Sequence, residues 1–158
     1  MDLVDLTGSL PLTQDMAGKN KIAKVHYETL AEFRYALRKF LHFSETAAQA
    51  AGVTPQQHQA MLAIKGFPGR DQVTVGELAE RLQVKHHSAV GLVDRLVAEN
   101  YVRRVAGQKD RRQVLVALTA RGESVLEKLS ATHRDQLSRI GPQINRLLEM
   151  LPGVRSPE

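Results

Sequence analysis

The amino-acid sequence predicts a mainly α-helical fold with one small β-ribbon. Apolar residues recur at three- and four-residue steps in two long segments, one in each half of the chain. Between these segments, two shorter helical patterns are separated by a tight break, which is typical of two helices set at a steep angle. A valine-rich ribbon with a basic, glycine-containing loop follows the second of them. The length of 158 residues suits one compact domain.

The composition excludes several classes of protein. The chain has no cysteine, so disulfides, thiolate metal ligands and thiol redox switches are ruled out. No run of residues approaches the ~18 apolar residues of a membrane span. The N-terminus starts acidic and lacks a basic-then-apolar signal pattern. We therefore expect a cytoplasmic protein.

The first part of the chain divides into an arm and a long helix. Residues 1–20 carry Gly8, Pro11 and Gly18 without a sustained period, and we expect an irregular arm there. An amphipathic helix is expected within residues 21–53, where Gly52 supplies the positive φ that favours a helix end. Its apolar positions are Ile22, Leu30, Phe33, Leu37, Phe40 and Leu41.

The segment 54–118 is expected to form a separate lobe of three helices and a hairpin. Thr54 with Gln57, and Thr74 with Glu77, have the spacing of capping boxes that start two of these helices. The first should bury Ala60, Met61 and Ile64, and the next Leu78, Ala79 and Leu82. Residues 73–75 form a short extended piece between them.

Residues 83–85 break the pattern before the third helix of the lobe, which begins at His86 or His87. Its expected buried side is Ala89 or Val90, followed by Val93, Leu96 and Val97. Asn100 ends this helix, because asparagine tolerates the left-handed conformation. Two antiparallel strands are expected at 101–105 and 114–118, with Val114, Val116 and Leu118 on one face of the second.

Residues 119–158 complete the chain with C-terminal helices. Thr119 caps a long helix whose apolar positions include Val125, Leu126, Leu129, Leu137 and Ile140. Proline lacks an N–H group and clashes with the preceding turn, so Gly141-Pro142 should break or kink this helix. A final short helix would then carry Ile144, Leu147, Leu148 and Leu151.

Positive charge is concentrated in the lobe. Ten Lys/Arg and six Asp/Glu lie within 54–118, so this segment carries +4 of the net charge of +5. Half of those cations lie between Arg103 and Arg112. A clustered excess suits a polyanion, because each neutralised phosphate releases counterions. Charge alone leaves an ordinary solvated surface about equally plausible.

Two stretches carry a resemblance to a known family: TVGELAERLQVKHHSAVGLVDRLVAENYVRR and KDRRQVLVALTARG. Asp-Arg-Arg followed by an apolar strand and Leu-Thr-x-x-Gly is typical of the MarR family of bacterial transcription regulators, which residues 21–151 resemble. The resemblance implies a winged helix-turn-helix with a small β-wing. It also implies a homodimer formed by the first and last helices, which binds a palindromic operator on double-stranded DNA, usually as a repressor. In that family a small effector, often an aromatic acid or phenolic, commonly releases the DNA.

The start of the helix after the break is the expected reader of bases. In a helix-turn-helix, the N-terminal residues of the second helix meet base edges in the major groove. Lysine donates to guanine or phosphate, serine and histidine donate or accept, and glycine allows close approach. The residues concerned are Lys85, His86, His87, Ser88 and Gly91. The alternative is an ordinary solvated helix start.

The wing is the second expected contact. Asp110 can hold the Arg112 guanidinium through a fork of hydrogen bonds, so that the arginine enters a minor groove. Lys109 and Arg111 would add phosphate contacts. The alternative is a mobile basic hairpin without a partner. Thr54, Gln56 and Thr74 lie at helix starts, where free N–H groups favour phosphate, although capping alone also explains them.

No catalytic, metal or cofactor site emerges from the sequence, and we do not expect an enzyme. Adjacent His86 and His87 diverge by about 100° around a helix, and His86, Ser88 and Asp94 cannot converge as a triad. A structural metal remains an alternative for the six histidines. The family's ligand pocket suggests six positions, each of which also suits core or surface: Phe33, Arg34, Leu37, His42, His58 and Met61. The competing function is a protein-interaction module with a winged-helix shape, which would have little reason to keep the basic wing.

Overall fold

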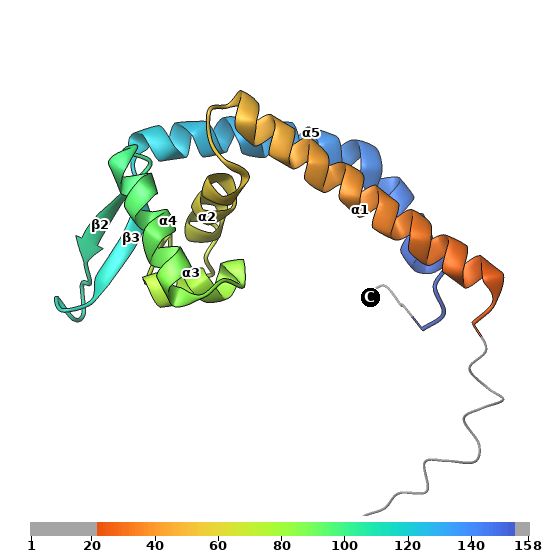
Figure 1. Ribbon diagram of the computed structural model, residues 1–158, viewed down its shortest axis with the longest axis horizontal. Helices are drawn as coiled ribbons and strands as arrows, with labels where there is room; N and C mark the ends of the chain where they lie inside the picture. Colours follow the sequence, from red (N-terminus) through yellow and green to blue (C-terminus); the bar gives the residue numbers. More distant parts are fainter. Residues whose placement is uncertain (1–21, 154–158) are drawn as a thin grey trace, which may run out of the picture.

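The computed structural model describes residues 22–153, and the arm predicted for residues 1–20 lies outside this range. Helices α1 (Lys24–Ala50) and α5 (Ala120–Glu149) lie side by side as one long pair. We call α1 and α5 the helical pair. The remaining elements form a compact lobe at one end of this pair (Figure 1).

The lobe contains three helices and a three-stranded antiparallel sheet. Its helices are α2 (Pro55–Lys65), α3 (Val75–Leu82) and α4 (His86–Ala98). Its strands are β1 (Gln72–Val73), β2 (Val102–Ala106) and β3 (Val114–Leu118), in the order β1-β3-β2. The expected hairpin is confirmed, with Val102 opposite Leu118 and Ala106 opposite Val114. The extended piece before α3 was expected, but its pairing with β3 was not.

Local hydrogen bonds at the helix ends agree with the sequence expectations. The side chain of Thr54 accepts from the backbone N–H of Gln57, and that of Thr74 accepts from Glu77, each at 3.1 Å. Each N3 side chain accepts in return from the cap residue, which completes both capping boxes. After α1, Gly52 has φ of 81°, and after α4, Asn100 has φ of 61°.

The expected burial patterns of the lobe hold for α4 and fail for β3. On α4, Ala89, Val93 and Leu96 are buried as expected, and Leu92 is a buried residue that the sequence did not indicate. On β3, both faces are covered from Leu115 to Leu118, and only Val114 is exposed. Its neighbours β1 and β2 pair along its edges and helices α2 and α5 pack against it, so its residues do not alternate between core and water.

The expected break at Gly141-Pro142 is also wrong. Helix α5 is continuous through Pro142, and no separate final helix is present in the described residues. Proline removes the hydrogen bond that the carbonyl group of Ser138 would otherwise accept and crowds that carbonyl group. Ser138 lies at the surface, where water can satisfy that carbonyl group.

The helical pair joins the lobe at a very close contact. The hydroxyl of Thr119 accepts from the backbone N–H of Gly122 at 3.1 Å and donates to the carbonyl oxygen of Asn100 at 2.7 Å. A Cβ atom on Gly122 would lie 2.0 Å from the carbonyl oxygen of Tyr101. Glycine is therefore required where α5 crosses the end of α4 and the start of β2.

Candidate nucleic-acid interface

The break between α3 and α4 fixes the start of α4. Gln83 adopts the left-handed conformation with φ of 54°, and the backbone N–H of Val84 donates to the carbonyl oxygen of Ala79 at 3.0 Å. Lys85 is the extended cap residue, and α4 begins at His86. Because Ala89, Leu92, Val93 and Leu96 face the core, the opposite side of this helix is open to solvent. The exposed residues of the first turn and its cap are Lys85, His86, His87 and Ser88.

The exposed face of α4 continues along one stripe to Gly91 and Arg95. A Cβ atom on Gly91 would lie 3.6 Å from the Nη1 atom of Arg95, so the guanidinium lies back over the glycine. Asp94 pairs with Arg104 on β2, which ties α4 to the wing.

The wing loop is held by backbone hydrogen bonds. The N–H of Gly107 donates to the carbonyl oxygen of Gln113 at 2.8 Å, and the N–H of Gln113 donates to that of Asp110 at 3.0 Å. A Cβ atom on Gly107 would lie 2.6 Å from the Asp110 carbonyl oxygen, so this crossing requires glycine. The loop therefore has a defined shape that presents exposed cations, which are Lys109, Arg111 and Arg112.

The contact between Asp110 and Arg112 differs from the one expected. The carboxylate of Asp110 accepts from the backbone N–H of Arg112 at 2.9 Å. None of the ion pairs within residues 22–153 joins this carboxylate to the Arg112 guanidinium. The local bond closes a tight turn without ordering the long arginine side chain. Asp110 thus shapes the loop and leaves the guanidinium in solvent.

Of the three predicted residues at helix starts, Gln56 lies next to the start of α4. Gln56 and Ser88 line the same small cleft of about 140 Å³ between α2 and α4. The hydroxyls of Thr54 and Thr74 accept the capping hydrogen bonds described above. The carboxylate of Glu77 also pairs with Arg70, and the hydrogen bond from Arg70 lowers the pKa of Glu77.

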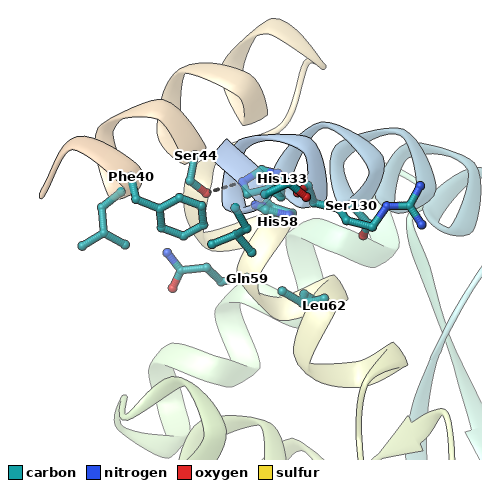
Figure 2. Close-up of a pocket in the computed structure, with 11 residues that line it drawn as sticks. Phe40, Ser44, His58, Gln59, Leu62, Ser130 and His133 are labelled. Carbon is teal, nitrogen blue, oxygen red and sulfur yellow. Dashed lines mark hydrogen bonds between the residues drawn. The ribbon is translucent and has the colours of Figure 1, made fainter. Parts of the chain in front are cut away.

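A groove of about 720 Å³ lies between the lobe and the helical pair (Figure 2). Its walls come from α1, α2 and α5 and include Phe40, Leu41, Leu62 and Leu137. The polar lining residues are Ser44, His58, Gln59, Ser130, His133, Arg134 and Ser138. Sequence reasoning missed most of this set, because the α5 residues follow α1 by about 90 positions.

Only one of the six suggested ligand positions lines this groove. His58 does so, whereas Met61 is fully buried in the core. Phe33 is half-buried on α1, and the remaining three, Arg34, Leu37 and His42, are exposed on the same helix. None of these four α1 residues lines the groove.

A pair of histidines forms the inner wall of the groove. The rings of His58 and His133 have their centroids 4.8 Å apart. Burial lowers the pKa of His58, and the nearby His133 lowers it further. Among the described residues, no group of three or more His, Asp or Glu is arranged to hold a metal ion. No helix within residues 22–153 is long and apolar enough to cross a membrane.

The helix pair α3–α4 followed by the β2–β3 wing defines a winged helix-turn-helix protein. The model of the MarR family matches residues 51–113. The transcriptional activatory protein BadR of Rhodopseudomonas palustris is 33% identical over 110 residues, covering 68% of this chain and 63% of that protein. The HTH-type transcriptional repressor MdtR of Bacillus subtilis is 32% identical over 88 residues, covering 56% and 55% respectively. The chain thus matches less than two thirds of the length of either relative.

The fold agrees with these matches. The crystal structure of RV1404 from Mycobacterium tuberculosis is 26% identical, with a TM-score of 0.62, and the match covers 85% of this chain and 86% of that one. The chain belongs to the MarR family. Both curated relatives are named as regulators of transcription, and neither is named as an enzyme.

Proposed function

We propose that this protein is a DNA-binding regulator of transcription. The observation that carries the proposal is the exposed, carboxylate-free first turn of α4, which lies in the same lobe as a shaped, basic wing. Such a helix reads base edges in a major groove, while the wing reaches the neighbouring minor groove. Lys85, His86, His87 and Ser88 are the proposed base-reading group, and Lys109, Arg111 and Arg112 contact the backbone and minor groove.

We further propose that the protein acts as a homodimer on a palindromic operator. One face of α1 carries an apolar stripe that includes Tyr27 (56% exposed) and Leu41 (54% exposed). Leu30 and Leu37 lie on the same face at helical spacing and are also exposed. A second copy that covers this stripe would pair the two lobes. Two recognition helices about 34 Å apart would then fit successive major grooves.

The groove between the lobe and the helical pair is the proposed effector site. Apolar walls with Arg134 and His133 at the side suit a small aromatic acid. A ligand there would contact both the lobe and the pair, and so would favour one lobe spacing over another. The protein would release the operator if the distance between the two lobes in the ligand-bound dimer no longer fits both half-sites.

Repression is the proposed outcome, because it requires only that the dimer occupy its operator. The curated relatives include both an activator and a repressor. A reporter gene placed behind the selected operator distinguishes the two modes. Reporter output should rise when the gene for this protein is deleted.

Mobility shift over a salt series tests DNA binding directly. The operator is first selected from random duplex by the full-length protein. Arg112→Ala should weaken binding by about tenfold or more and reduce the dependence of log affinity on log salt by about one. Arg38→Ala on α1 is the matched control, since it removes the same charge outside the lobe, and it should leave affinity nearly unchanged.

Absence of binding to any duplex, even at low salt, would favour the protein-interaction module. If the Arg112→Ala variant and the wild type bind DNA with equal affinity, the proposed contact of the wing is wrong. The proposed base reading by α4 would still stand. Circular dichroism of both variants should match that of the wild type, because both arginines are exposed.

A further inference from the structure

His58 and His133 meet at the contact between the lobe and the helical pair. His58 is buried on α2, and His133 is half-buried on α5. Their rings are tilted by 44° with centroids 4.8 Å apart. Figure 2 shows both rings beside Ser44 and Phe40 of α1. We call this contact of α2, α5 and α1 around the two histidines the seam.

Both ring nitrogens of His133 are hydrogen-bonded in the closed seam. Its Nδ1 atom lies 2.6 Å from the carbonyl oxygen of Leu129. A carbonyl oxygen only accepts, so Nδ1 carries the hydrogen and donates. Its Nε2 atom lies 2.7 Å from the hydroxyl of Ser44, which can donate or accept. His133 thus links α5 to α1 while its face meets the lobe.

The seam contains no acidic partner for a protonated imidazole. Within residues 22–153, Arg134 is the one Lys, Arg, Asp or Glu that lines the groove, and it is positive. From α1, Phe40 and Phe43 pack edge-on against His133, while the titratable residues next to them, His42 and Glu45, are exposed. At the lobe end, Glu99 takes a hydrogen bond from Gln57 at 2.9 Å. Neither histidine belongs to any ion pair among the described residues.

A proton added to the buried His58 ring would therefore be poorly compensated. The charge would be partly desolvated and next to a second imidazole. Separation of α2 from α5 would admit water and relieve both costs. The neighbouring groove already gives water a path to this contact.

We propose that the seam is a pH-sensitive switch, in which protonation of the His58–His133 pair separates α2 from α5 and turns the lobe relative to the helical pair. The proposal rests on the proposed function in one respect: the turned lobes would no longer fit both half-sites of an operator. The closed seam is favoured by neutral histidines. It is fully favoured above the ordinary histidine pKa of about 6.5 and is lost progressively as the pH falls below that value, because burial lowers the pKa of His58.

Hydrogen–deuterium exchange without DNA tests the switch itself. Exchange is compared at pH 7.5 and 5.5, after correction for the intrinsic pH dependence of the chemistry. Protection of α2 and of residues 130–137 should fall several-fold at the lower pH. The double variant His58→Gln, His133→Gln should lose this pH effect, and His42→Gln, an exposed histidine on α1, should retain it. Equal protection of the wild type at both pH values overturns the switch, as does an unchanged pH effect in the double variant.

Titration of the wild-type imidazole signals by NMR keeps the test independent of how the variants fold. The His58 signal should titrate below the ordinary histidine midpoint, together with changes in the signals of α2. A His58 midpoint at or above the ordinary value overturns the switch.

Operator affinity separates this proposal from the proposed function. The affinity of the wild type relative to the double variant should fall several-fold between pH 7.5 and 5.5. This ratio cancels any effect of His86 and His87, which both proteins keep. Failure to bind DNA at either pH overturns the regulator proposal, while the exchange experiment still decides the switch. Binding with a constant ratio overturns the switch alone.

Discussion

The lobe and the helical pair bury their residues very differently. Five of the 11 residues of α2 are buried, whereas only three of the 27 residues of α1 are buried. The largest fully buried side chains, among them Met61, Ile64, Leu78, Leu96 and Val116, all belong to the lobe. Over most of their length α1 and α5 touch each other along one face and present their other faces to solvent (Figure 1).

This contrast indicates that the core lies mainly in the lobe, and Ala48 of α1 with Leu126 and Leu129 of α5 join it where the helical pair meets the lobe. A helix usually gains stability from the burial of an apolar face. In α1 one apolar face is exposed and gains no such burial within a single chain. A substitution in the lobe should therefore act on folding, and one on the exposed stripe of α1 should act on assembly.

Gly122→Ala should cause the largest loss of stability. The added methyl group would lie 2.0 Å from the carbonyl oxygen of Tyr101, and a backbone atom at the base of the lobe cannot give way easily. We expect the free energy of unfolding to fall by about 3 kcal/mol, measured by urea denaturation. Gly76→Ala on α3 is the control, because its Cβ atom would meet nothing closer than 3.8 Å. Equal losses of stability for the two substitutions would show that the backbone between α4 and β2 can shift to accommodate the methyl group.

Leu30→Glu with Leu41→Glu should act on assembly instead. Both leucines are exposed in the single chain and lie on the apolar stripe of α1. Charge buried at a dimer contact is costly. We therefore expect the dissociation constant of the dimer to rise by about 100-fold, which corresponds to about 2.8 kcal/mol. Sedimentation of the variant should show monomers whose lobe keeps its protection from hydrogen exchange. Lys39→Glu, on another face of α1, should leave the dimer intact, and a double variant that remains dimeric would place the interface elsewhere.

Local signals in the sequence were sufficient for the elements of the lobe. Thr54 with Gln57 and Thr74 with Glu77 form their capping boxes, and Asn100 adopts its left-handed conformation. These features depend on residues within one turn of each other. They are therefore determined by local hydrogen bonds and not by tertiary packing.

The errors arose where distant contacts decide the outcome. Pro142 remains within α5, although the isolated sequence favours a break there. Val114 was grouped with Val116 and Leu118, but β1 pairs on the far side of β3 and the fold covers both faces. The groove could not be predicted, because Ser44 and His133 meet only after α1 and α5 align. Asp110 bonds to the backbone of Arg112 and not to its guanidinium, a choice that spacing alone does not decide.

Glu77→Gln should give the smallest effect and a distinct dependence on pH. The carboxylate pairs with Arg70 and accepts from the backbone N–H of Thr74 at 2.8 Å. The hydrogen bond from Arg70 lowers the pKa of Glu77 below its ordinary value of 4.5. The ionised group therefore stabilises the fold above that value, and this contribution is lost as the pH falls through the lowered pKa of the folded state.

Glutamine keeps an acceptor for Thr74 but removes the charge opposite Arg70. Because the pair is partly exposed, we expect a loss of less than about 1 kcal/mol at pH 7, measured by urea denaturation. The difference from the wild type should shrink as the pH is lowered below 4.5. A difference that stays constant with pH would mean that the charge of Glu77 contributes nothing. Either result measures how much this one surface ion pair contributes to the stability of the lobe beside its buried core.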